Sequence, residues 1–509
     1  MALDVQLSSR ARLDPDWLRT RLFIDGHWVD AEAGGEIDIL DPHDGSTITR
    51  IAEARAADVD RAVDAAERAF AAWAATPASE RGRILLRLAD RIEAEAAELA
   101  RLESIDTGHP LRDSTRLDVP RTAATFRYFG GMADKHEGSV IPVERGFLNY
   151  LLREPIGVVG QIVPWNFPLM FTSWKLGPAL AAGNTVVMKP SELTPLSTLR
   201  IAELLQEVGV PDGVVNIVPG YGDPAGWAIA THPRIRKLSF TGSTATGRRL
   251  VEGSAASLKR LHLELGGKGA NIVFEDADIA QAVNGSAFAI FHNQGQACIA
   301  GSRLLLHERI ADRFLDDFLS VANNIRLGDP LDMATEMGPL TSKLHRDRVL
   351  AYVEVARAEG GEILCGGEAP STPALANGYY VKPTVVRARP DARVSREEVF
   401  GPFVVVTTFS DDDEALEIAN STEYGLGGGL WTRDVSRAHR VAHLLHTGMV
   451  WINAYKRVSP ASPFGGVRGS GYGREMGFEA MHEYTQPKAV WVNVDAELPD
   501  WYPRPDAER

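Results

Sequence analysis

The chain has 509 residues and a mass of 55.4 kDa, more than one hydrophobic core usually supports, so two or three domains are expected. Hydrophobic residues make up 44% of the chain and charged residues 24%, the composition of an ordinary globular protein. The formal net charge of −14 argues against a nucleic-acid-binding protein, because phosphate would be repelled.

Two cysteines, Cys298 and Cys365, are too few for a disulfide framework and are typical of a reducing compartment. Residues 1–10 lack the basic start and apolar core of a signal peptide. No apolar run approaches the roughly 18 residues needed to cross a bilayer. A cytoplasmic protein without membrane association is therefore expected.

Residues 1–56 are predicted to form an irregular arm with short strands, for instance 22–29 around an Asp-Gly turn. Two long helices should follow. The first carries an apolar stripe at helical spacing, made of Val59, Ala62, Val63, Ala66 and Phe70. The second is predicted to begin at a Ser79 cap, and its apolar face consists of Ile84, Leu85, Leu88 and Ile92.

From about residue 157, short apolar strands alternate with helices. The strands are predicted at 158–163, 185–188, 214–218 and 237–240, and the helices at 174–182, 194–208 and 223–231. Such alternation predicts right-handed βαβ units and a parallel sheet, whose ligands bind at the carboxyl ends of the strands. The turns at these ends contain Pro164, Lys189, Gly220 and Gly242. A second α/β domain is predicted from 271 to about 447.

Cys298 is the first candidate for chemistry. It lies in Asn293-Gln-Gly-Gln-Ala-Cys-Ile-Ala-Gly-Ser302, where small neighbours leave room for a substrate carbon and backbone amides could bind an oxyanion. A lone cysteine is more often a small buried hydrophobe. An acid, an amide and the βα alternation upstream favour the catalytic interpretation here, whereas Cys365 has no such neighbours.

Four upstream segments carry the remaining candidates. Pro164-Trp-Asn-Phe-Pro168 holds an amide between two prolines, either as an aimed donor or as a turn former. Lys189-Pro-Ser-Glu192 suits the sugar and phosphate of a nucleotide, or is a solvated charge pair. The turn from Gly242 to Gly247 is of the phosphate-binding type but lacks the usual dinucleotide spacing. Glu264 ends a strand beside two glycines, although a surface glutamate is the commoner case.

Taken together and in this order, these segments resemble the aldehyde dehydrogenase superfamily. The segments 397–402 and 463–475 match as well, and the resemblance covers roughly residues 20–494. Within that superfamily, the chain is similar to the NAD-preferring, non-acylating, tetrameric branch that oxidises free aldehydes to acids. The resemblance implies a Rossmann-like NAD-binding domain (1–136 and 152–264), an α/β catalytic domain (265–468), a small β oligomerisation element (137–151 and 482–494) and a C-terminal tail (495–509).

The resemblance also implies the catalytic roles. Cys298 would be the nucleophile, and it needs activation because a free thiol has a pKa of about 8.5. The side chain of Asn166 and the backbone N–H of Cys298 would hold the oxyanion. Glu264 would activate the water that hydrolyses the thioester, which argues against a CoA-acylating enzyme. Glu475 would take part in a proton relay.

NAD is the implied cofactor, and no metal is expected. Lys189 and Glu192 should hold the adenosine ribose hydroxyls, Ser243 should face the pyrophosphate, and Glu398 should bind the nicotinamide ribose. A carboxylate at position 192 should favour NAD over NADP. Further cofactor contacts are expected from Ile162, Pro164, Trp165, Gly222, Phe240, Gly242, Leu265 and Phe400.

The substrate pocket is expected to contain Phe167, Phe171, Trp174, Ala297, Ile299, Lys456, Arg457, Val458 and Phe464. Val458 stands where relatives that take aromatic or quaternary-ammonium aldehydes often carry an aromatic residue, which argues against a betaine aldehyde. Lys456 and Arg457 would favour a substrate with a carboxylate or several oxygens, unless both side chains point to solvent. The expected partners are an aldehyde substrate and further copies of the chain, as a dimer of dimers.

Two alternatives stay open. One is a semialdehyde or phosphorylated-aldehyde dehydrogenase of the same fold, and the other is a catalytically retired structural homologue, against which intact Cys298, Glu264 and Asn166 weigh. The tail adds a separate hypothesis. Trp501 and Tyr502 are costly to leave in water, and prolines at 499, 503 and 505 stiffen the segment. The tail is therefore predicted to pack across a neighbouring subunit near its substrate entrance.

Overall fold

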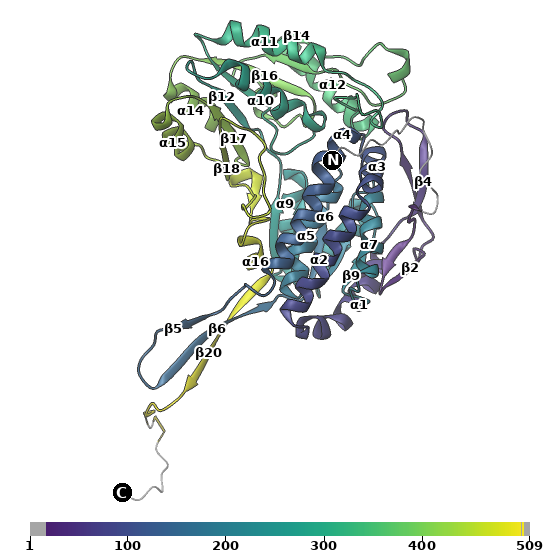
Figure 1. Ribbon diagram of the computed structural model, residues 1–509, viewed down its shortest axis with the longest axis vertical. Coiled ribbons are helices and arrows are strands. Elements are labelled where there is room, and N and C mark those ends of the chain that lie inside the picture. Colours follow the sequence, from purple (N-terminus) through teal and green to yellow (C-terminus); the bar gives the residue numbers. More distant parts are fainter. Residues whose placement is uncertain (1–16, 500, 503–509) are drawn as a thin grey trace, which may run out of the picture.

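The computed structural model describes residues 17–499, 501 and 502, which form two α/β units and a projecting β arm (Figure 1). Residues 1–16 of the predicted N-terminal arm, and residues 500 and 503–509 of the tail, lie outside the described residues. Within the described ranges, no helix has the length and apolar character that crossing a membrane requires.

The first unit is built on an eight-stranded sheet in the order β19-β11-β10-β7-β8-β9-β1-β2. Its five central strands are parallel, and β1 and β19 join them antiparallel. The strands are β1 (Leu22–Ile24), β2 (His27–Val29), β7 (Val158–Ile162), β8 (Thr185–Lys189), β9 (Val215–Ile217), β10 (Lys237–Thr241), β11 (Arg260–Glu264) and β19 (Gly471–Tyr472). The parallel sheet predicted from the alternation is confirmed.

Strand order reverses between β7 and β10, because β8 and β9 continue on one side of β7 while β10 and β11 lie on the other. A ligand crevice is expected at such a switch point, outside the carboxyl ends of the strands. Residues 163–167 follow β7 there, and residues 242 and 243 follow β10.

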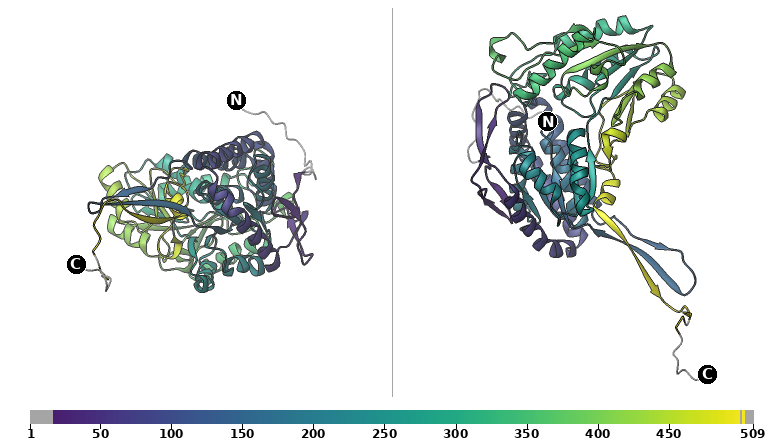
Figure 2. Two further views of the ribbon diagram at one scale, coloured as in Figure 1. Left: turned by 90° about the horizontal axis from the view of Figure 1, so that it is seen from below. Right: turned by 180° about the vertical axis from the view of Figure 1, so that it is seen from behind.

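Helices cover this sheet on both faces (Figures 1 and 2). They are α1 (Ala56–Ala75), α2 (Ala78–Ala94), α3 (Ala96–Thr107), α4 (Leu111–Asp113), η2 (Ser114–Asp118), α5 (Val119–Met132), α6 (Pro168–Ala182), α7 (Leu196–Glu207), η3 (Gly222–Gly226), α8 (Trp227–Thr231), α9 (Thr244–Ser254) and η4 (Ala255–Ser257). Buried apolar residues on α1 and α2 confirm most of the two predicted stripes.

Three helix boundaries differ from the prediction. Helix α2 begins after Pro77 and places Ser79 inside its first turn, so Ser79 is not the cap. Helix α6 begins at Pro168, earlier than predicted, because proline fits the first helical position, where no N–H donor is needed. The segment predicted as one helix at 223–231 forms η3 and α8, and Asp223 inside η3 has an extended backbone.

The second unit contains a seven-stranded sheet in the order β14-β15-β16-β13-β12-β17-β18, in which only β14 is antiparallel. The strands are β12 (Ala270–Val273), β13 (Arg303–His307), β14 (Glu362–Cys365), β15 (Thr384–Arg387), β16 (Phe403–Phe409), β17 (Gly427–Trp431) and β18 (Met449–Ile452). Its helices are α10 (Ile279–Phe291), η5 (His292–Gly295), α11 (Ala311–Asn324), α12 (Lys343–Ala358), η6 (Pro373–Leu375), α13 (Arg393–Arg396), α14 (Asp412–Asn420) and α15 (Val435–Leu444).

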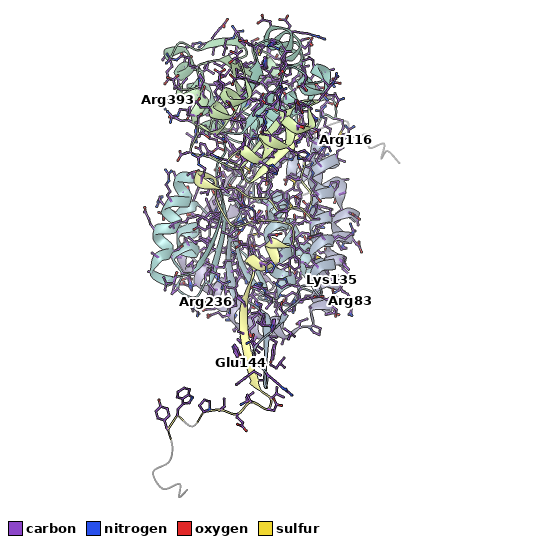
Figure 3. All side chains as sticks on the ribbon, turned by 90° about the vertical axis from the view of Figure 1, so that its left-hand side faces the viewer. Arg83, Arg116, Lys135, Glu144, Arg236 and Arg393 are labelled. Carbon is purple, nitrogen blue, oxygen red and sulfur yellow. The ribbon has the colours of Figure 1, made fainter. Side chains whose placement is uncertain are left out.

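The arm consists of β5 (Ser139–Ile141), β6 (Phe147–Pro155) and β20 (Thr485–Asn493), with β6 in the middle. It projects from the first unit beside α16, away from the second unit, and carries the C-terminal segment beyond it (Figures 1 and 2). Glu144 lies on this arm, well away from Lys135 and Arg236 on the body (Figure 3). The remaining elements are β3 (Glu36–Leu40), β4 (Thr47–Ala52), η7 (Arg468–Ser470) and α16 (Glu479–Glu483).

One hydrophobic cluster runs from the first unit into the second. It includes Phe171 and Trp174 of α6 together with Phe291 of α10 and Phe318 of α11. Because this cluster is continuous, the end of β7 and the segment after α10 are held against each other. Asn166, after β7, and Cys298, after α10, come from these two segments.

Candidate active site

Cys298 lies between η5 and β13, in a segment whose backbone is closely fixed. Asn293 and Gln294 have left-handed backbones, with φ of 54° and 53°. A Cβ on Gly295 would lie 2.0 Å from the carbonyl oxygen of Gly401, so only glycine fits there. The side chain of Gln296 accepts a hydrogen bond from the Thr341 N–H at 3.0 Å. These contacts hold the segment that presents the thiol.

Two cavities meet at Cys298. The larger, of about 300 Å³, lies at the carboxyl ends of β7 and β10, where the strand order reverses. The smaller, of about 40 Å³, lies between the two units and is mostly apolar. Cys298 and Phe171 line both. A thiol in this position can be reached from two sides by different molecules.

Asn166 is buried and lines the larger cavity. The side-chain Nδ2 of Asn166 donates to the backbone carbonyl oxygen of Gln296 at 2.9 Å. The backbone carbonyl oxygen of Asn166 accepts from Asn293 Nδ2 at 2.8 Å. An amide nitrogen carries two N–H bonds. One of them is used by Gln296, so one is left to stabilise a developing oxyanion.

Burial raises the pKa of the Cys298 thiol, and the nearby carboxylates of Glu264 and Glu398 raise it further. The thiol is therefore protonated at neutral pH in this arrangement. A nucleophilic role requires a base, or added positive charge beside the sulfur.

Glu264 ends β11 and is buried, but it lines neither cavity. Its Oε1 lies 3.1 Å from His262 Nε2, in a hydrogen bond, and its Oε2 has no hydrogen-bond partner among the described residues. Burial, followed by the charge of Glu475, raises the pKa of the Glu264 carboxyl well above its usual range. The structure thus places Glu264 in a buried polar network that is near enough to Cys298 to raise the pKa of its thiol, although the Glu264 carboxyl does not line the cavities themselves.

That network is centred on Lys175 and Glu475. Lys175 Nζ lies 2.5 Å from Glu475 Oε1 and donates to Ser239 Oγ at 2.9 Å. Gln161 Nε2 donates to the Lys175 carbonyl oxygen and to the Tyr484 hydroxyl. Lys175 and Glu475 are both almost fully buried. The sequence singled out Glu475 but not Lys175 or His262. Lys175 lies on α6 and His262 on β11, and both join this network only through the packing of the fold.

The larger cavity contains many of the predicted cofactor residues. Pro164, Trp165, Gly242, Ser243, Leu265, Glu398 and Phe400 all line it. Ser243 caps α9 by accepting from the Thr246 N–H at 3.1 Å, so the start of this helix faces the cavity and suits a phosphate. Glu398 Oε1 accepts from the Gly267 N–H at 2.8 Å, and burial raises the pKa of its carboxyl to about 7.

The other predicted cofactor residues, Ile162, Lys189, Glu192, Gly222 and Phe240, do not line this cavity. Lys189 Nζ donates to the Gly220 carbonyl oxygen at 2.7 Å and lies 3.4 Å from Glu192 Oε2. The five residues that do not line the cavity belong to the adjoining ends of β7, β8 and β10 and to η3. The whole arrangement can accept a dinucleotide that runs from the end of β8 across the start of α9 to Cys298.

The lining of this cavity also includes residues that the sequence did not indicate, among them His345 and Arg348 of α12. The His345 ring lies tilted against Trp165 with ring centroids 5.1 Å apart, and its Nε2 lies 2.7 Å from the Phe400 carbonyl oxygen. Burial lowers the pKa of His345 to about 4, so this ring is neutral. Nothing near α12 in the sequence marks it as part of a site.

The smaller cavity is lined by the predicted residues Phe167, Phe171, Trp174, Ala297, Ile299, Lys456, Val458 and Phe464. The prediction that Arg457 lies in the substrate pocket was wrong, because Arg457 is exposed and does not line the cavity. Lys456 has a left-handed backbone with φ of 53°, which turns its side chain inward, while the Arg457 carbonyl accepts from Trp451 Nε1 at 2.8 Å. The cavity also contains residues that the sequence did not indicate: Arg121, Met170, Phe288 and His292.

A histidine and acid cluster lies behind this cavity. His109 Nδ1 lies 2.7 Å from Asp118 Oδ2, and both are buried. The rings of His109 and His292 have centroids 5.4 Å apart. Burial lowers the pKa of His109, but the charge of Asp118 and its hydrogen bond raise that pKa by more, so the pKa of His109 lies above its usual value. His109, Asp113 and His292 hold ligand-type atoms within 4.8 Å of one another, a grouping that the sequence did not indicate.

The model of the aldehyde dehydrogenase family matches residues 28–490. A putative aldehyde dehydrogenase, DhaS, of Bacillus subtilis (strain 168) is 44% identical over 93% of this chain and 96% of its own length. The crystal structure of a putative aldehyde dehydrogenase from Burkholderia cenocepacia is 71% identical and has a TM-score of 0.95, over 96% of this chain and all (100%) of that one.

A second solved relative is PnpE from Pseudomonas sp. WBC-3, which is 69% identical with a TM-score of 0.95 over 96% of this chain and 100% of that chain. PnpE has also been crystallised in complex with nicotinamide adenine dinucleotide, and that structure is 70% identical to this chain. At these identities the agreement covers the fold and nearly the whole length of the chain.

Proposed function

Because this chain belongs to the aldehyde dehydrogenase family and is an NAD-dependent enzyme of that kind, we propose that it converts an aldehyde and water to the carboxylic acid through covalent intermediates on Cys298. One observation carries the proposal. Cys298 borders both a cavity at the switch point of the parallel sheet and a second, mostly apolar cavity, with Asn166 beside it. One cavity suits the cofactor and the other suits the aldehyde.

In the first step the Cys298 sulfur attacks the aldehyde carbon. A carbon–sulfur bond forms as the carbonyl π bond breaks, the carbonyl oxygen becomes an oxyanion, and the thiol proton passes to solvent water. Asn166 Nδ2 and the backbone N–H of Cys298 stabilise that charge as it develops. When bound, NAD⁺ supplies the oxidising power by accepting the hydride from the thiohemiacetal, which leaves a thioester on Cys298. Water then attacks the thioester, releases the acid and returns the proton to the thiol.

Glu264 is the proposed base for the water. Its carboxyl lines neither cavity and its pKa is raised by burial, so it acts after turning away from His262 and towards Cys298. A Cβ on Gly465 would lie only 2.7 Å from Glu264 Oε1, so the glycine leaves space beside the carboxylate. Lys175 and Glu475 are proposed to hold and pass the proton that Glu264 takes up.

The residues of the larger cavity fit NAD. The capped start of α9 offers N–H groups to a pyrophosphate, and Glu398 and the Trp165 and Phe400 rings flank the part of the cavity next to Cys298. Lys189 and Glu192 are proposed to bind the adenosine ribose. The NAD complex of PnpE, 70% identical to this chain, supports the same cofactor here.

The proposal includes an oligomer and a reducing compartment. The arm carries exposed apolar side chains, among them Val140 at 72% and Trp491 at 56% exposure, which a neighbouring subunit would cover. A homo-oligomer, as a dimer of dimers, is proposed on that basis. The cytoplasm is proposed because the mechanism needs a free thiol, and both cysteines are unpaired.

Cys298→Ala tests the proposal, with Cys365→Ala as the matched control. We expect Cys298→Ala to abolish NADH formation from any aldehyde while NAD⁺ still binds, measured by calorimetry. Cys365→Ala should keep wild-type turnover, because Cys365 lies on β14, outside both cavities. A Cys298→Ala enzyme that retained a tenth of the turnover would refute the nucleophile. A wild-type protein that oxidised no aldehyde would instead support the retired homologue.

A further inference from the structure

The smaller cavity contains positive charge but no negative charge. Its lining residues include Arg121 of α5 and Lys456, and no aspartate or glutamate. The other lining side chains are apolar or aromatic, apart from Cys298 and His292, and burial holds the pKa of His292 well below its usual range. An unbalanced cation inside a largely apolar cavity is costly. A bound anion would remove that cost.

Arg121 is the stronger of the two cations. Its guanidinium forms no hydrogen bond or ion pair with any residue in the described ranges. Burial lowers the pKa of Arg121 and the Asp118 carboxylate raises it, but arginine stays charged at any physiological pH. Asp118 itself is engaged with His109 at 2.7 Å. The Asp118 carboxylate therefore contacts His109 through one oxygen and acts on Arg121 only through space, without an ion pair between them in the described residues.

Arg127 shows what an ordinary arginine does on the same helix. It lies in α5 about two turns beyond Arg121 and pairs with Asp90 at 2.7 Å and with Glu93 at 2.6 Å. Arg112, near the start of the same helical region, has Asp113 and Glu336 as partners. Arg121 differs from these neighbours because it faces the cavity beside Cys298.

Lys456 adds a second cation to the same cavity. It is buried, and its Nζ makes one long contact of 3.5 Å, to the carbonyl oxygen of His292. Burial lowers the pKa of its ammonium to about 7, as expected for a lysine without a counter-ion. Its left-handed backbone is uncommon for a residue other than glycine, and such backbone strain is concentrated at functional sites.

The shape of the cavity limits what accompanies the anion. Phe167, Phe171, Trp174, Phe288 and Phe464 form much of its wall. Its volume is only about 40 Å³, so the space between these walls is narrow. A thin, open carbon chain therefore fits better than an aromatic ring.

We infer that the substrate is an open-chain aldehyde with a carboxylate at its far end, bound with the aldehyde carbon at Cys298 and the carboxylate at Arg121 and Lys456. This inference rests on the proposed function and names its substrate class, the semialdehydes of dicarboxylic acids. An arginine fork matches a carboxylate with two parallel hydrogen bonds. A phosphorylated aldehyde is bulkier and more highly charged, and it is one outcome of the test below.

The test uses matched substrates on the full-length enzyme. The semialdehyde of a five-carbon dicarboxylic acid is compared with its methyl ester, which has the same chain but no charge, and with an aldehyde phosphate. In wild type, kcat/KM should be highest for the semialdehyde. Arg121→Gln should lower it roughly 10- to 100-fold for the semialdehyde and less than about twofold for the ester, as loss of a charge-assisted hydrogen bond predicts. Arg121→Lys should recover part of it.

Arg116→Gln is the matched control. Arg116 belongs to η2, directly before α5, and it is exposed at the edge of the body (Figure 3). Its removal should change neither substrate's kcat/KM. An equal loss for semialdehyde and ester in Arg121→Gln would overturn the carboxylate subsite, as would a wild-type preference for the ester or for the phosphate.

A binding measurement separates this inference from the proposed function. Glutarate, a dicarboxylate that cannot react, is titrated into NAD⁺-loaded Cys298→Ala enzyme by calorimetry. We expect binding there and none in the Cys298→Ala/Arg121→Gln variant, with Cys298→Ala/Arg116→Gln retaining it. Equal glutarate affinity in all three variants would refute the subsite even if turnover behaved as proposed. Failure of every aldehyde to reduce NAD⁺, with glutarate binding intact, would refute the reaction and leave the anion site.

Discussion

Lys175→Met is the most informative change in the buried network beside Glu264. Lys175 Nζ lies 2.5 Å from Glu475 Oε1, and both side chains are excluded from water. Removing the ammonium would leave the Glu475 carboxylate buried without its counter-ion. Breaking one partner of a buried pair costs about 3–5 kcal/mol, so the free energy of unfolding should fall by that amount.

The same substitution should change the pH dependence of turnover. The charge of Lys175 lowers the pKa of Glu264, against burial and the charge of Glu475, which raise it. Without Lys175 the pKa of Glu264 should rise further. An opposite charge at close range moves a carboxyl pKa by about one to three pH units. Glu264 works as a base in its ionised form, so activity is lost as pH falls, and this loss should begin at a higher pH.

The assay is steady-state kcat against pH at saturating aldehyde and NAD⁺, together with denaturant unfolding followed by tryptophan fluorescence. Lys237→Met is the matched control, since Lys237 is a second buried lysine, paired with Glu483 at 2.8 Å. It should also destabilise the protein but leave the acid side of the profile in place. Lys175→Met/Glu475→Leu should recover most of the stability, because no carboxylate is left unpaired. An unchanged acid limb in Lys175→Met would refute the electrostatic coupling to Glu264.

Two further substitutions test the cofactor and the base. Glu264→Gln should give a burst of NADH followed by a stalled steady state, because thioester hydrolysis needs the base more than acylation does; equal loss of burst and steady-state rates would make Glu264 chiefly an activator of the thiol. Wild type should prefer NAD⁺ over NADP⁺, and Glu192→Gln should narrow that preference, since like-charge contact with a 2′-phosphate costs on the order of 1–3 kcal/mol. Comparable kcat/KM for both cofactors in wild type would count against a role for Glu192.

The parallel sheet of the first unit could be predicted because its strands are short, buried and bounded by turn residues. β7, β8 and β10 all follow this pattern, and each was predicted to within one residue. β19 could not be predicted, because it has only two residues, Gly471 and Tyr472, and its partner β11 lies before the whole second unit in the sequence. The first residue of a helix was harder to predict than the bounds of a strand, because a proline can begin a helix as well as interrupt one.

At the site, sequence patterns identified residues that lie beside turns and glycines, such as Asn166 and Ser243. They did not identify Arg121 or His345, which reach the cavities only through the way α5 and α12 pack. The inward turn of Lys456 and outward position of Arg457 depend on one left-handed backbone conformation, which no neighbouring residue type signals. The direction of the Glu264 side chain likewise depends on the buried network of Lys175 and Glu475.

The C-terminal tail gives the last prediction. It is tied to the arm as far as Ala496, whose N–H donates to Asn493 Oδ1 at 2.9 Å, and Val494 N–H donates to the Gly146 carbonyl oxygen at 2.8 Å. Beyond that point Trp501 is 77% exposed and Tyr502 92% exposed. Covering both rings would contribute about 3–6 kcal/mol, which offsets much of the cost of ordering the segment, and the prolines at 499, 503 and 505 lower that cost. Deleting residues 496–509 should therefore lower the melting temperature or the oligomer mass at low protein concentration, or change KM for bulky aldehydes. A full-length Trp501→Ser/Tyr502→Ser variant should reproduce the effect. If mass, melting temperature and KM were unchanged in both variants, the tail would have no role in assembly or at the substrate entrance.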